Sequence, residues 1–132
     1  MFDIILVDSF DPGGPVQSLE TADFHQVVSE RLNPDGIAVF QTDSPYIRSQ
    51  FIRATIQSVS PFFSMYTPYI CSIRSFPDGI CSFLACAHKK EILDQFDETR
   101  YNSLSLECTY YNDAIHTGAF MLPQSLKRIM SS

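Results

Sequence analysis

The stretch IILVDSFDPGGP, residues 4–15, decides the fold of this chain. A near-continuous apolar run such as residues 4–7 is typical of a strand buried on both faces, so the loop after it leaves the sheet at a carboxyl end. Open α/β sheets bind their ligands at such ends. The loop carries two carboxylates, Asp8 and Asp11, on a backbone that two prolines stiffen and two glycines bend. It predicts a preformed anionic pocket for a cation, and the alternative is that the carboxylates only cap a turn.

The residues after this loop predict a helix and a second strand. Thr21 is a candidate N-cap for a helix that runs to Leu32, because apolar residues recur there at helical spacing. Residues 33–36 then predict a turn, and residues 37–40 a short apolar strand. A strand, a helix and a strand with short connections form a βαβ unit. If the two strands are parallel, the loops at their carboxyl ends face one cleft, and Gln41 lies on the same rim as Asp8.

The rest of the chain is expected to extend this sheet. A second helix is predicted over residues 45–59, and an antiparallel strand pair over residues 62–73 and 79–87. Three shorter helices are predicted over residues 91–96, near Ala114 and from Pro123. No Gly-rich turn that could bind a nucleotide follows an earlier strand, so we expect the sequence to start in the middle of a domain. The predicted fold class is α/β, the second half of a Rossmann-like doubly wound sheet with an antiparallel C-terminal strand pair.

Composition limits the size and the partners of the protein. A chain of 132 residues that is 45% hydrophobic and 18% charged can bury one core, so one domain is expected. The net charge of −6 disfavours nucleic acid and anionic membranes and suits cationic ligands. Neither a signal-peptide pattern nor an apolar run of about 18 residues is present, so we expect a cytoplasmic protein without a membrane span.

The cysteines and histidines do not predict a metal site. The four cysteines fit no CxxC pattern and the three histidines no HExxH pattern. Buried, unreactive thiols are the better interpretation, because a free cysteine packs as a small hydrophobic residue.

Four segments together carry a resemblance to a known family. They are DIILVDSFDPGGPVQSL at 3–19, LNPDGIAVFQTDSPYIRSQFI at 32–52, SFPDG at 75–79 and YYNDAIHTGAFMLP at 110–123. In this order they resemble the C-terminal catalytic half of spermidine synthase, in the polyamine aminopropyltransferase family. In that family a small β domain and a Gly-rich cosubstrate motif come earlier in the chain. The resemblance implies that residues 1–132 form a partial catalytic domain, truncated at its amino-terminal side.

The resemblance also implies a reaction and a set of site residues. An aminopropyl group passes from decarboxylated S-adenosylmethionine to putrescine, giving spermidine and methylthioadenosine, without a metal or other cofactor. Asp8 is expected to be the proton acceptor, and Asp11 to stabilise the cationic substrate. Substrate contacts are expected from Gln41, Phe76, Gln17 and Pro15. Two positions depart from the family pattern: Phe76 stands where tyrosine is usual, and Arg74 where proline is usual.

Tyr110, Tyr111 and His116 match a family segment beside the cleft, and for these we favour a structural role. The complete enzyme is expected to be a homo-oligomer, either a dimer or a tetramer. Alone, the chain is expected to be nearly inactive, because half of the orienting pocket is missing. The free sheet edge beside the first strand predicts poor solubility or tight association.

Three alternatives to spermidine synthesis stay open. The chain is a related diamine transferase such as a putrescine N-methyltransferase, a non-catalytic partner of full-length subunits, or an unrelated Rossmann-like binding domain. The residues that select the cosubstrate lie outside the four segments, so the segments do not decide between the two transferases.

Overall fold

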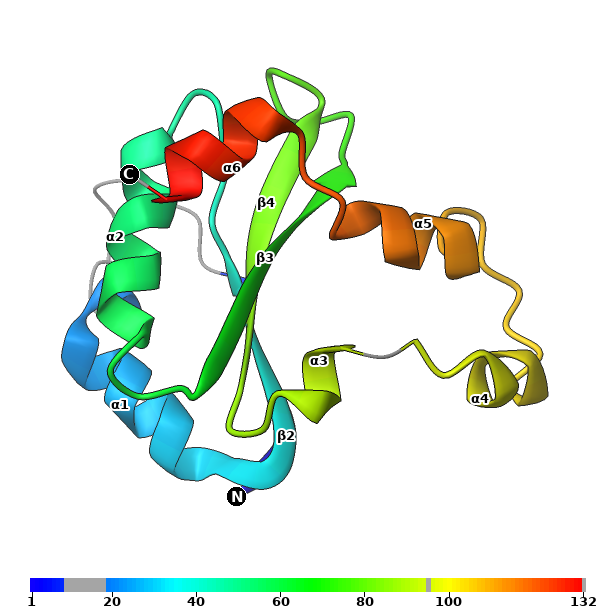
Figure 1. The fold of residues 1–132 in the computed structure, drawn as a ribbon, viewed down its shortest axis with the longest axis horizontal. Coiled ribbons are helices and arrows are strands. Elements are labelled where there is room, and N and C mark those ends of the chain that lie inside the picture. The colour runs from blue at the N-terminus through cyan, green and yellow to red at the C-terminus, as the bar shows by residue number, and fades with distance from the viewer. Residues whose placement is uncertain (9–18, 95, 132) are drawn as a thin grey trace.

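A mixed four-stranded sheet organises the protein (Figure 1). The computed structural model describes residues 1–8, 19–94 and 96–131. The strands are β1 (Phe2–Val7), β2 (Leu32–Gln41), β3 (Met65–Ser72) and β4 (Ile80–Ala87), in the spatial order β1-β2-β4-β3. β1 and β2 are parallel, and β4 runs antiparallel to both β2 and β3. The predicted α/β fold, with its parallel first pair and antiparallel second pair, is confirmed.

The helices lie on both sides of this sheet. They are α1 (Ala22–Arg31), α2 (Ser49–Val59), α3 (Glu91–Asp94), α4 (Glu98–Ser103), α5 (Asp113–Ala119) and α6 (Gln124–Ser131). Figure 1 shows α1 and α2 along one side, with α6 beside α2, while α4 and α5 project away from the sheet on the other side. The α1 and α2 layer buries the main core.

That core forms because strand residues alternate between the two faces of the sheet. Ile5 and Val7 of β1 share a face with their partners Ala38 and Phe40 of β2. This face packs against apolar residues of α1, α2 and the turn after α2, which include Val28, Val59 and Phe63. Burying each side chain of this size stabilises the fold by about 1.5–3 kcal/mol.

The boundaries of the two long helices follow from their caps. The Thr21 hydroxyl accepts from the Phe24 amide at 3.2 Å, as its position before the helix predicted. The second helix was predicted from Pro45, but α2 begins only at Ser49. Residues 45–47 form a turn instead, which the Arg48 amide closes by donating to the Ser44 carbonyl at 2.9 Å.

Two predictions about the first strands were wrong. β1 is not buried on both faces: it lies at the sheet edge, and Phe2, Ile4 and Leu6 are 58%, 66% and 71% exposed. No element of the described residues covers this side of β1. Residues 33–36 are also not a separate turn, because they belong to an irregular start of β2, where the register shifts between Phe2 and Ile4.

Smaller differences concern the C-terminal third. α3 ends at Asp94 rather than at residue 96, and α4 was not predicted, although Asp97 caps it by accepting from the Arg100 amide at 2.8 Å. Cys81 and Cys86 are buried as expected and Cys71 is half-buried, but Cys108 is exposed. Local polarity hid the short helix, because its residues make no buried apolar stripe.

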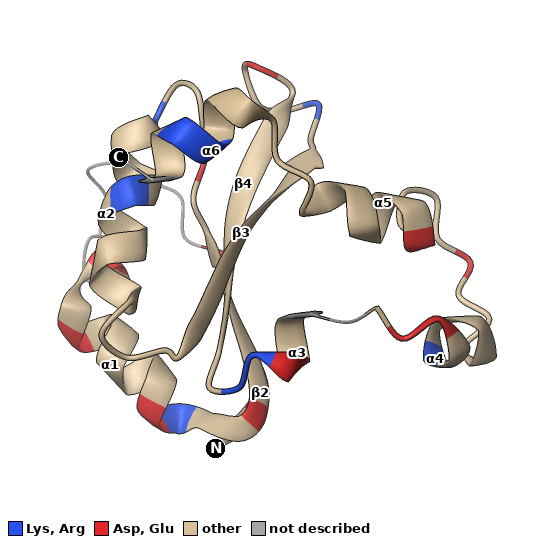
Figure 2. Ribbon diagram, in the orientation of Figure 1, with Lys and Arg blue, Asp and Glu red and all other residues tan. Residues whose placement is uncertain are grey.

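The charged residues are spread over several elements. Figure 2 shows acidic residues on α1 and near α4, and Lys and Arg residues on α2 and α6. Within the described part of the chain, none of the helices is both long and apolar enough to cross a membrane.

Candidate active site

Asp8 and Gln41 leave neighbouring parallel strands at the same edge of the sheet. Val7, the last residue of β1, pairs in register with Phe40 of β2, so the residue after each of them lies at the same rim. Asp8 is exposed and Gln41 is half-buried. The structure therefore brings together the two polar residues that the sequence predicted at this position.

The Gln41 side chain carries a buried hydrogen-bond acceptor. Its Oε1 has no hydrogen-bond partner within residues 1–8, 19–94 and 96–131. Leaving a buried acceptor without a donor costs about 1–3 kcal/mol. An ammonium group is a strong donor and would satisfy this oxygen, while the neutral amide would leave the charge of the site unchanged.

Cys81 of β4 lies beside these residues. Burial raises the pKa of its thiol to about 12, a hydrogen bond from Gln41 acts in the opposite direction, and the carboxylates of Asp43 and Asp8 add to the rise. The thiol stays protonated near neutral pH and is therefore a poor nucleophile.

Thr42, Asp43 and Ser82 form a polar cluster next to this rim that was not predicted from the sequence. Thr42 is fully buried, and its amide and hydroxyl both donate to Ser82 of β4, each at 2.8 Å. The Ser82 amide donates in turn to the Asp43 carbonyl at 2.8 Å. These bonds continue the β2–β4 ladder beyond the Gln41–Phe83 pair. The available sequence signal was an Asp directly before Ser-Pro, which is typical of a turn closed by its own side chain.

Phe76 lies in the loop between β3 and β4. The loop closes through the Ile73 amide, which donates to the Gly79 carbonyl at 2.9 Å, and Gly79 adopts a left-handed φ of 75°. A hollow of about 280 Å³ is lined by Phe76 and its neighbours, namely Asp43, Ser44, Ile47, Arg48, Ser75 and Pro77. Gln41 lines a different, smaller hollow, so the described contacts do not join these two predicted substrate residues directly.

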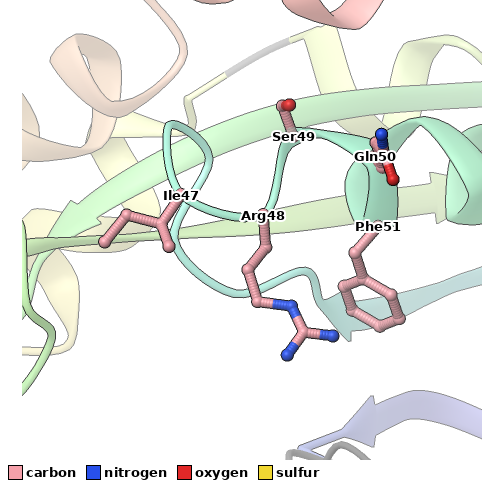
Figure 3. A pocket seen from close by; sticks show the side chains of 5 residues that line it. All are labelled: Ile47, Arg48, Ser49, Gln50 and Phe51. Carbon is pink, nitrogen blue, oxygen red and sulfur yellow. The ribbon is translucent and has the colours of Figure 1, made fainter.

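Arg48 connects the loop after β2 to the start of α2. Its Nε lies 3.3 Å from Oδ2 of Asp43, and its guanidinium carbon lies 5.7 Å from the centre of the Phe51 ring. Figure 3 shows Arg48 and Phe51 extending to the same side, with Ser49 on the opposite side. The segment 47–51 lines a hollow of about 540 Å³. The positive charge of Arg48 therefore lies beside the carboxylate of Asp43.

The other face of the sheet carries an apolar hollow of about 400 Å³ between the strands, α3 and α5. Tyr111 and His116 lie here, with the tyrosine Oη 3.0 Å from the histidine Nδ1. Burial raises the pKa of Tyr111 and lowers the pKa of His116, so both groups favour their neutral forms. The Tyr110 hydroxyl accepts a hydrogen bond from the Ser72 amide at 2.9 Å. These contacts suit the structural role that the sequence favoured.

Three predicted site residues, Asp11, Pro15 and Gln17, lie outside the described residues. In the part of the chain that is described, no group of three or more His, Cys, Asp or Glu side chains is placed to hold a metal ion.

Known proteins share this arrangement of strands. Residues 1–96 match the family of the spermine/spermidine synthase domain. The chain belongs to the spermine/spermidine synthase family. A solved spermidine synthase in complex with the transition state analogue AdoDATO superposes with a TM-score of 0.91 at 26% identity, over 98% of this chain and 45% of that one. The spermidine synthase of Thermotoga maritima gives 0.88 at 25% identity, over 98% and 44%.

Curated relatives in this family are named as enzymes. The polyamine aminopropyltransferase of Caldicellulosiruptor saccharolyticus is 35% identical over 98% of this chain and 46% of its own length. That of Lachnoclostridium phytofermentans is 32% identical over 99% and 47%. The chain thus spans about half the length of the curated relatives that it matches.

Proposed function

We propose that this chain supplies the diamine-binding side of an aminopropyltransferase site and acts in spermidine synthesis. The observation that carries the proposal is the buried Gln41 Oε1, which has no hydrogen-bond partner among the described residues and lies at the rim where Asp8 leaves β1. An acceptor beside a carboxylate suits an ammonium group, because both can receive its protons. The membership of the family supports the choice of an amine as the ligand.

In the proposed reaction the amine attacks an activated carbon. Putrescine, whose nitrogens resemble that of lysine with a pKa of about 10.4, must first lose a proton, and the Asp8 carboxylate receives it. The nitrogen lone pair then forms a bond to the aminopropyl carbon next to the sulfonium of decarboxylated S-adenosylmethionine. The carbon–sulfur bond breaks, and its electron pair stays on sulfur as neutral methylthioadenosine. The second product is spermidine, and no metal or redox cofactor takes part.

The remaining assignments belong to the same proposal. Asp11 stabilises the cationic substrate, while Gln17, Pro15 and Phe76 contact or enclose it. Phe76 keeps an aromatic wall but has no hydroxyl to assist the amine, so transfer is expected to depend more on Asp8 and Gln41. The complete protein acts as a homo-oligomer in the cytoplasm, and the residues that hold the cosubstrate lie outside this chain.

The test uses the protein as its source cells make it, captured with an antibody against residues 110–123 and weighed intact. Captured wild-type protein should convert putrescine and decarboxylated S-adenosylmethionine to spermidine and methylthioadenosine. Asp8→Asn should lower kcat by about 10²-fold or more, because it removes the proton acceptor. Asp3→Asn, at the other end of β1, is the matched control and should leave kcat unchanged.

Other outcomes would point elsewhere. Equal kcat for Asp8→Asn and wild type would remove Asp8 from the mechanism. Methyl transfer from S-adenosylmethionine to putrescine, without aminopropyl transfer, would favour the N-methyltransferase. An inactive protein of about 15 kDa that co-purifies with a complete synthase would favour a non-catalytic partner.

A further inference from the structure

Asp43 combines burial with a backbone conformation that few residues adopt. It is 4% exposed and has a φ of 62°. A non-glycine residue in the left-handed region persists only where its surroundings hold it there, and such residues gather at functional sites. Aspartate tolerates this conformation better than most residues because its side chain bonds the nearby backbone.

Neighbouring residues hold both the side chain and the backbone carbonyl of Asp43. Its Oδ1 accepts from the Ser44 amide at 2.6 Å. Its carbonyl accepts from the Ser82 amide at 2.8 Å and from the Ser82 hydroxyl at 2.7 Å. Its Oδ2 faces Nε of Arg48 at 3.3 Å. One residue therefore ties the end of β2 to β4 and to the start of α2.

The same residue connects to both sides of the candidate site. Gln41 lies two residues earlier, on the strand end that the Thr42–Ser82 bonds hold. On the other side, the Ser44 hydroxyl donates to Oδ2 of Asp78 at 2.5 Å, in the loop that carries Phe76. Asp43 and Phe76 also line one hollow. The turn at Asp43 therefore links the strand end that carries Gln41 to the loop that carries Phe76.

We propose that Asp43 is a positioning residue that holds the Gln41 acceptor and the Phe76 wall in the spacing at which the diamine binds. This inference rests on the proposed function, because it assumes an amine ligand at the rim. Asp43 acts through Ser44, Ser82 and the loop 74–79 rather than on the reacting atoms. Its loss should therefore weaken binding of the diamine and change the chemical step little.

The kinetic test compares three substitutions in the native protein. Asp43→Ala should raise KM for putrescine about tenfold, because sub-ångström to ångström shifts of positioning groups have effects of this size or larger. It should change kcat and the KM for decarboxylated S-adenosylmethionine by less than about threefold. Asp43→Asn keeps the acceptor for the Ser44 amide and tolerates the left-handed turn, so it should restore KM to near the wild-type value. Asp43→Gly keeps only the left-handed turn, so its KM for putrescine should lie between those of Asp43→Ala and Asp43→Asn.

A second readout does not depend on turnover. The chain contains no tryptophan, so Phe76→Trp introduces a single fluorescent reporter in the loop. Adding Asp43→Ala to that variant should increase quenching of the reporter by acrylamide, whereas adding Asp23→Ala, in the first turn of α1, should not. Unchanged quenching in a folded double variant would overturn the proposal.

The outcomes separate the two proposals. An active wild type whose putrescine KM is unaffected by Asp43→Ala would overturn the positioning role and leave the proposed function intact. If Asp43→Ala lowered kcat and raised both KM values by the same factor, and also lowered the melting temperature, Asp43 would only hold the fold. A wild type that neither turns over nor binds putrescine in calorimetry would refute the proposed function and, with it, a diamine-positioning role for Asp43.

Discussion

His25 is a buried imidazole that joins two helices. It is 2% exposed, its Nδ1 lies 2.8 Å from the Ser58 hydroxyl of α2, and its ring meets the edge of Phe40 with centroids 4.9 Å apart. Burial lowers its pKa from the ordinary value of 6.5, so the folded protein holds it neutral. As pH falls below 6.5, the imidazole of His25 is protonated in the unfolded chain before it is protonated in the folded protein. The stability that the neutral ring contributes is therefore complete above pH 6.5 and is lost as pH falls toward the folded-state pKa.

We expect the urea midpoint of the wild type to be lower at pH 5.5 than at pH 7.5. The difference between the two midpoints should be smaller for His25→Leu. Each unit of difference between the folded and unfolded pKa corresponds to about 1.4 kcal/mol. Ser58→Ala is the matched control, because it removes the hydrogen bond but keeps the titrating ring. It should lower the midpoint at both pH values and keep the steeper pH dependence. Parallel pH profiles for wild type and His25→Leu would contradict this account.

At the scale of the elements, the irregular start of β2 depends on one glycine. A Cβ at Gly36 would lie 2.9 Å from Cγ and Cδ1 of Leu32, and 3.0 Å from the carbonyl oxygen of Asp3 on β1. Leu32 is 2% exposed and cannot move outward easily. The close approach of β1 to β2 at this point therefore requires that no side chain be present.

Gly36→Ala should lower the free energy of unfolding by about 1–3 kcal/mol, the usual cost of overpacking. Gly118→Ala in α5 is the opposite case, because a Cβ there meets nothing within 4 Å. It should raise the free energy of unfolding by about 0.5–1 kcal/mol through helix propensity. Chemical denaturation measures both, and a neutral Gly36→Ala would mean that β1 can shift at no cost.

The whole molecule has two unequal sides. The sheet face under α1 and α2 is buried, whereas Phe2, Ile4 and Leu6 leave an apolar strip exposed on the edge strand β1. Register pairs Ile4 with Ile37 and Leu6 with Val39, so this strip is continuous with the apolar hollow under α3 and α5. An edge strand with such a strip favours association with another chain.

We therefore expect the 132-residue chain to self-associate at micromolar concentrations. Leu6→Lys should shift sedimentation toward the monomer, because a charge on an edge strand opposes pairing. Val27→Lys, at an exposed apolar position on α1, is the control and should leave the association unchanged. A monomeric wild type, or equal association of both variants, would contradict the prediction.

Several features of the fold and the site were readable from local patterns. The apolar run before Asp8, the Thr21 cap and the short connection to residues 37–40 predicted the parallel pair and placed Asp8 and Gln41 at one rim. These features depend on alternation, capping and connection length, which act between residues close in sequence. The boundary at Ser49 was missed because the turn at Pro45 competes with the helical pattern, and α4 was missed because its residues make no buried apolar stripe.

The sequence by itself determined the class of fold, the parallel pairing of the first two strands and the polar residues at their carboxyl ends. Only the tertiary structure decided the order β1-β2-β4-β3, the exposure of β1 and the left-handed turn at Asp43. Burial depends on which elements pack on a strand, and the turn at Asp43 depends on Ser82, 39 residues away in the chain. Contacts between distant residues decide the strand order and the exposure of β1, and the local Asp-Ser-Pro pattern indicates a turn at Asp43 but not its bonds to Ser82.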